Sequence, residues 1–63
     1  MKILDKLALN GRMILTLEGD VLGMNASKVI IDDKKYDYDI AYDMKNTIGV
    51  KVDCIIKDEI DFV

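Results

Sequence analysis

Apolar and acidic residues alternate almost without interruption between Lys28 and Met44. One set of alternate positions is aromatic or apolar: Tyr36, Tyr38, Ile40, Tyr42 and Met44. The other set is mostly acidic: Asp37, Asp39, Ala41 and Asp43. Side chains on a strand project alternately to opposite faces. The pattern therefore predicts a strand with one aromatic face and one carboxylate face.

This strand and the apolar run before it are predicted to form a hairpin. With residues 33–34 as the turn, Val29 faces Tyr38 and Lys28 faces Asp39. Directly opposed residues share a face, so this register joins an apolar to an aromatic side chain and a base to an acid.

A second hairpin is predicted around the polar residues 45–47, which would form a three-residue loop. In that register Tyr38 faces Cys54, while Asp39 faces Asp53 in an unfavourable pair of like charges. Cys54 then lies among apolar residues of one face. Because the chain has no histidine and no second cysteine, we expect Cys54 to be a small buried hydrophobic residue and not a nucleophile.

The first nine residues fit two structures. The apolar residues at positions 3, 4, 7 and 8 fit one face of a helix, which Asn10–Gly11 would end. Asn-Gly is also a strong hairpin signal, which would pair residues 7–9 with residues 12–14. We expect the helix, because a strand would place Asp5 on the same face as apolar residues.

The other predicted strands are short and end at Gly, Asn or Asp, since the chain has no proline. Residues 12–17 place three apolar side chains on one face, namely Met13, Leu15 and Leu17. Shorter strands are expected at 21–22 and 60–63. About five strands in one domain, residues 1–63, predict a mainly β fold: a small bent sheet or barrel of the SH3-like or OB-like kind, preceded by the short helix.

The small size of the chain favours self-association. A chain of 63 residues buries a small share of its surface and usually needs a disulfide, a structural metal or a partner subunit. One cysteine and no histidine exclude an internal disulfide and an ordinary zinc site. We therefore expect a homodimer or higher oligomer.

The net charge of −3 repels nucleic acid and anionic membranes at long range, so we do not expect either as a partner. No apolar run approaches the roughly 20 residues that span a bilayer. The first residues do not resemble a secretion signal, and a single free thiol fits a reducing compartment. We expect a cytoplasmic protein.

The aromatic and acidic faces supply the candidate interaction residues: Tyr36, Tyr38, Tyr42, Met44, Asp37, Asp39, Asp43 and Asp53. The tyrosines are expected in the core or at a protein interface, because base stacking also requires a cationic groove. The aspartates are expected on a solvated face paired with lysines. Their other interpretations are a site for a hard cation and a mimic of nucleic-acid phosphates.

Catalytic parts are missing from the sequence. There is no histidine, the only serine has no base to activate it, and the glycines are isolated. We expect no cofactor, no metal and no catalytic activity. The sequence thus predicts a protein-interaction module that self-associates, with an acidic decoy of nucleic acid as the alternative and a nucleic-acid-binding barrel as the third.

Overall fold

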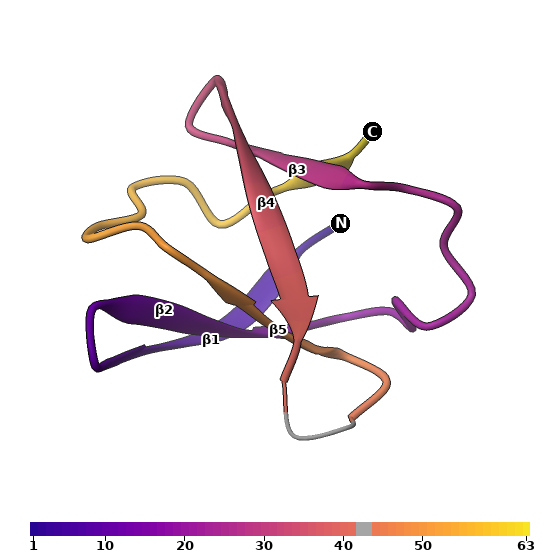
Figure 1. The fold of residues 1–63 in the computed structure, drawn as a ribbon, viewed down its shortest axis with the longest axis horizontal. Helices are drawn as coiled ribbons and strands as arrows, with labels where there is room; N and C mark the ends of the chain where they lie inside the picture. The colour runs from indigo at the N-terminus through magenta and orange to yellow at the C-terminus, as the bar shows by residue number, and fades with distance from the viewer. Residues whose placement is uncertain (42–43) are drawn as a thin grey trace.

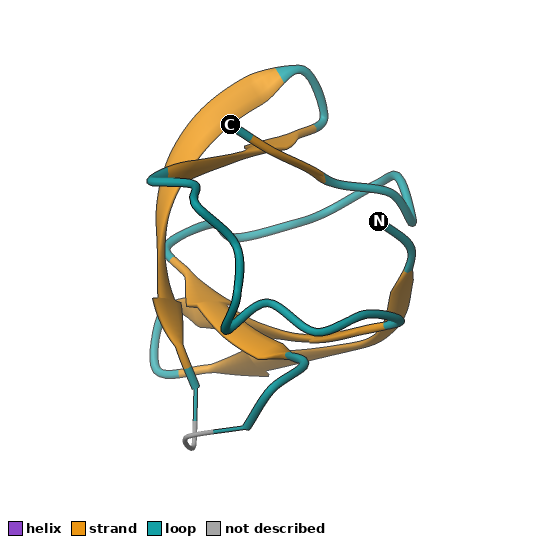
Figure 2. Ribbon diagram, turned by 90° about the vertical axis from the view of Figure 1, so that its right-hand side faces the viewer, coloured by secondary structure: helices purple, strands orange, loops and turns teal. Residues whose placement is uncertain are grey.

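The computed structural model describes residues 1–41 and 44–63, and within these residues the fold is all β, with no helix. Six strands form one antiparallel sheet that curls into a half-barrel (Figures 1 and 2). Their bounds are β1 Ile3–Leu9, β2 Arg12–Leu17, β3 Lys28–Ile31, β4 Lys34–Ile40, β5 Thr47–Val50 and β6 Asp61–Phe62. In space they follow the order β1-β2-β5-β4-β3-β6. The predicted mainly β, bent architecture is confirmed.

The predicted N-terminal helix is wrong, because these residues form strand β1. Asn10 and Gly11 both have positive φ, 51° and 77°, and connect Leu9 to Arg12 in a two-residue turn. Such a turn matches the right-handed twist of the strands beside it. The pattern of β1 is broken by an irregularity between Ile3 and Asp5, which the period-two analysis could not anticipate.

The β3–β4 hairpin forms, but its predicted register is wrong by two residues. The turn lies at Asp32–Asp33, both with positive φ, 49° and 70°. Val29 therefore faces Tyr36, and Lys28 faces Asp37. Aspartate tolerates this left-handed conformation better than lysine does, which favours the observed turn. A slip of two residues keeps every side chain on its predicted face.

The β4–β5 pairing differs more from the prediction. Tyr38 faces Val50 and not Cys54, and Asp39 faces Gly49, so the expected clash with Asp53 does not occur. The chain after β5 leaves the sheet, and Cys54 is exposed instead of buried. The predicted strand at 21–22 is also absent.

The core lies on the inner face of the curled sheet. The predicted alternation of β2 is confirmed, because Met13, Leu15 and Leu17 are all buried. Other strands and loops contribute the remaining core residues: Ile3, Val21, Val29, Ile31, Ile48, Val50, Ile55 and Ile60.

The C-terminal segment joins the two ends of the half-barrel. Strand β6 pairs with β3, and the residues just before it bind the start of β1. The Ile3 N–H donates to the Asp58 carbonyl at 2.7 Å, and the Ile60 N–H donates to the Met1 carbonyl at 2.9 Å. The side chain of Ile60 is buried at this seam.

Candidate functional site

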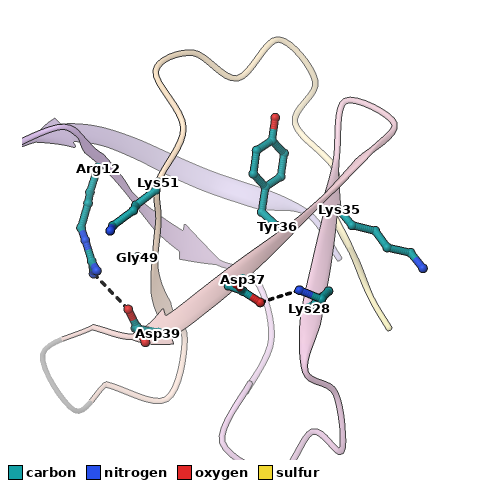
Figure 3. A pocket seen from close by; sticks show the side chains of 8 residues that line it. All are labelled: Arg12, Lys28, Lys35, Tyr36, Asp37, Asp39, Gly49 and Lys51. Atoms are coloured by element: carbon teal, nitrogen blue, oxygen red, sulfur yellow. Dashed lines mark hydrogen bonds and ion pairs between the residues drawn. The ribbon is translucent and has the colours of Figure 1, made fainter.

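A charged groove lies on the sheet where β5 ends and the chain turns away (Figure 3). Its volume is about 450 Å³. Four strands and the segment after β5 line it, through Arg12, Lys28, Lys35, Tyr36, Asp37, Asp39, Gly49 and Lys51. We call it the β4 groove.

The groove exists because β5 is shorter than its neighbours. After Val50, the Val52 N–H donates to the Val50 carbonyl at 3.0 Å, a tight turn that leads the chain out of the sheet. The chain returns at the β3–β4 turn, where the Asp32 carboxylate accepts the N–H groups of Ile56 and Lys57 at 2.9 and 3.0 Å. These bonds hold the segment after β5 against the β3–β4 turn.

The Asp32 carboxylate is exposed, and its two backbone hydrogen bonds hold its pKa below the ordinary value of 3.8. A similar exposed carboxyl, Asp58, lies at the seam. Its hydrogen bond and ion pair with Lys6, at 2.8 Å, lower the pKa of Asp58 in the same direction. Both groups stabilise loop positions through their charged forms.

One ion pair crosses β5 at the floor of the groove. The Arg12 guanidinium on β2 donates to the Asp39 carboxylate on β4 at 3.1 Å. Gly49 lies between these strands and carries no side chain to separate the pair. A Cβ at Gly49 would stand 3.5 Å from Arg12 Nη1 and from Ile14 Cδ1, which is ordinary contact.

Lysines make the groove positive. Lys28 Nζ binds the Asp37 carboxylate at 2.7 Å, so both groove aspartates already have a cationic partner. Among the ion pairs of the described residues, none includes Lys35 or Lys51. With four cations and two carboxylates, the groove has a local charge of +2 in a chain of net charge −3.

The two described tyrosines of the predicted aromatic face, Tyr36 and Tyr38, are both half-buried and pack against the core. Tyr38 packs on the core: its hydroxyl donates to the Ala26 carbonyl at 3.1 Å, and its ring meets Phe62 edge-on with centroids 5.2 Å apart. Tyr36 is half-buried and lines the β4 groove. The sequence predicted Tyr36 on the face opposite Asp37 and Asp39, whereas in the structure all three line the β4 groove together with Arg12, Lys28, Lys35 and Lys51.

The other candidate residues lie elsewhere. Met44 is exposed and lines a different pocket, formed by residues 18–20 and 44–46. Asp53 is exposed in the segment after β5. Tyr42 and Asp43 fall outside the described residues. The eight candidates thus do not form one surface.

A second surface, absent from the sequence-based prediction, is apolar. Leu7 and Leu9 on β1 are 56% and 43% exposed, and both face outward beside Ile14 of β2. We call these three residues the hairpin patch. Interpreting residues 1–9 as a strand would have revealed the patch, because Leu7 and Leu9 are two positions apart and so lie on the same face of a strand.

The described residues contain no group of three or more His, Cys, Asp or Glu side chains placed to hold a metal ion. Nor do they include a helix long and apolar enough to cross a membrane. Comparison of the chain with family models, curated proteins and solved structures found no match.

Proposed function

We propose that this chain is a small protein-interaction module, cytoplasmic and without catalytic activity, that self-associates through the hairpin patch. The observation that carries the proposal is the outward exposure of Leu7 and Leu9 on the edge strand β1. The core is complete without them, so folding of one chain does not explain why this face is apolar. Exposed clusters of large apolar side chains commonly mark contact surfaces.

A second copy of the chain would bind the hairpin patch with matching charges at its two ends. Asp5 lies on the same outer face as the patch at one end, and Arg12 lies beside Leu9 at the other. A two-fold axis through the patch runs the two β1 strands in opposite directions. The acidic end of each copy then lies over the basic end of its partner, while the leucines meet at the centre.

The contact is expected between faces and not between strand edges. The Asp5 carboxylate accepts the Lys6 N–H at 2.9 Å, and Lys6 Nζ binds Asp58. These side chains occupy the free edge of β1 and oppose the addition of another strand there. The two outer faces would instead pack as stacked sheets.

Replacing Leu7 with lysine tests the interface. We expect the wild type to sediment above the 7.1 kDa mass of one chain at micromolar concentration, and Leu7→Lys to shift toward that mass. The matched control is Leu22→Lys, because Leu22 is similarly exposed, at 54%, but lies in a loop away from the patch. A wild type that sediments as a monomer throughout would contradict the proposal.

The alternative of an acidic decoy receives less support, because Asp37 and Asp39 already bind Lys28 and Arg12. Partnered carboxylates offer less charge to a site built for phosphates. If the decoy function holds, replacing both aspartates with asparagine should abolish binding to a nucleic-acid-binding protein while leaving self-association intact.

A further inference from the structure

We propose that the β4 groove binds an extended acidic segment of another polypeptide, which adds as a strand to the free edge of β4. This proposal concerns a surface separate from the hairpin patch and does not depend on self-association. It rests on three features of the groove: backbone groups of Lys35 that have no partner among the described residues, lysines that form no ion pair with those residues, and the charged Lys35 next to the partly apolar Tyr36.

The backbone of β4 offers an open edge at the groove. The ladder between β4 and β5 ends at Tyr38 and Val50, but β4 continues back to Lys34. In the two-residue hairpin, Lys34 forms the hydrogen-bonded pair with Ile31, so the N–H and C=O of Lys35 point away from β3. They point to the side that β5 has left. No described residue pairs with Lys35 on that side.

An incoming strand would occupy the position that β5 leaves vacant. Peptides bind to exposed sheet edges in this way, with main-chain hydrogen bonds providing affinity and alternate side chains providing specificity. The backbone N–H and C=O of the peptide residue opposite Lys35 would complete a hydrogen-bonded pair there.

The charges select an acidic segment. A residue opposite Lys35 shares its face, so a carboxylate at that position would lie within the cationic side of the groove. Lys51 and Arg12 line the same groove from the other side. Arg12 and Lys28 are held by Asp39 and Asp37, which leaves Lys35 and Lys51 as the cations that a ligand would engage.

Tyr36 follows Lys35 on β4 and gives the groove a partly apolar wall. It is half-buried, and its ring stands between β4 and the segment that follows Lys51 (Figure 3). A ligand residue opposite Tyr36 would place a small apolar side chain beside this ring. The ligand that fits is therefore an extended peptide in which a carboxylate, opposite Lys35, is next to a small apolar residue, opposite Tyr36.

A nucleic acid fits the groove less well. Single strands bind through a cationic groove combined with aromatic rings on which bases stack. Here the aromatic ring that lines the groove, Tyr36, packs against the core, and the carboxylates of Asp37 and Asp39 in the groove would repel phosphates.

The test uses the full chain and a fluorescein-labelled peptide, SEVEVES, with blocked ends. We expect saturable binding by fluorescence anisotropy, which weakens as salt is added. Lys35→Gln and Lys51→Gln should each weaken binding about two- to fivefold, the range expected for exposed charge pairs. Lys34→Gln is the matched control, because Lys34 neighbours Lys35 on β4 but does not line the groove.

Three further measurements separate strand addition from simple charge attraction. The peptide SEEEVVS has the same composition without alternation and should bind more weakly. Replacing both Lys35 and Lys51 with glutamate should reverse the preference, so that SKVKVKS binds and SEVEVES does not. Bound SEVEVES should also slow hydrogen exchange of the Lys35 amide, measured by NMR.

Several results would overturn the proposal. These are no binding of SEVEVES by the folded chain at millimolar concentration, equal weakening by Lys34→Gln, or tighter and lysine-dependent binding of a thymidine oligonucleotide. Binding should persist in Leu7→Lys. Its loss there would place the peptide on the hairpin patch. A wild type that binds SEVEVES but sediments as a monomer would contradict only the proposed function.

Discussion

At the residue scale, Asp32 performs two tasks that few residues combine. It adopts a positive φ of 49° in the β3–β4 turn, and its carboxylate accepts two backbone N–H groups from the segment that borders the groove. Asparagine can adopt the same backbone conformation but carries no charge. Asp32→Asn therefore separates the turn from the charge.

We expect Asp32→Asn to lower the urea midpoint at neutral pH. Because the pKa of Asp32 is lowered by folding, its stabilising contribution is present above pH 3.8 and is lost as the pH falls through the lower folded value. The difference between the two urea midpoints should shrink over that acidic range. A difference that stays constant down to pH 2 would contradict this role for the charge.

At the scale of the elements, β5 is the strand on which both the sheet and the groove depend. It pairs with β2 and β4, and its short length exposes the edge of β4. Gly49 at its centre lies beneath the Arg12–Asp39 ion pair. Glycine in the interior of a strand costs conformational entropy, so its presence calls for a structural reason.

The contacts of Gly49 distinguish two substitutions. A single Cβ would make ordinary contacts, and the φ of Gly49 is not in the left-handed region, so Gly49→Ala should raise the free energy of unfolding by about 0.4–1 kcal/mol. Gly49→Val must displace Arg12 and Ile14 and should lower it by about 1–3 kcal/mol. Urea denaturation measures both, and a loss of stability in Gly49→Ala would show that the strand requires glycine.

At the scale of the whole molecule, stability depends on the seam between the two ends of the chain. The backbone bonds between residues 1–3 and 58–60 close the half-barrel, and Ile60 is 1% exposed there. A chain of this length has a small reserve of stability, about 3–5 kcal/mol.

Ile60→Ala should therefore unfold much of the population at 25 °C, because removal of a buried isoleucine side chain costs about 2–5 kcal/mol. Ile56→Ala is the control, since Ile56 is 83% exposed four residues earlier, and should leave the melting temperature nearly unchanged. Circular dichroism on heating compares the two. A cooperative transition in Ile60→Ala at the wild-type temperature would exclude the seam as a main support.

The sequence by itself determined the local features of this protein. Period-two alternation identified β2 and β4 and assigned their faces, and composition excluded disulfide and zinc support. These features depend on residues near one another in the chain. The sequence also named Tyr36, Asp37 and Asp39 as candidate residues, but it did not bring them to one groove.

Only the tertiary structure decided the registers and the sites built on them. Shifting a strand by two or four residues preserves its apolar face, so hydrophobic alternation cannot distinguish Tyr38 opposite Val50 from Tyr38 opposite Cys54. The choice between helix and strand for residues 1–9 depended on pairing with β2, and that choice created the hairpin patch. The β4 groove likewise exists because β5 ends early, a consequence of long-range pairing that local pattern does not contain.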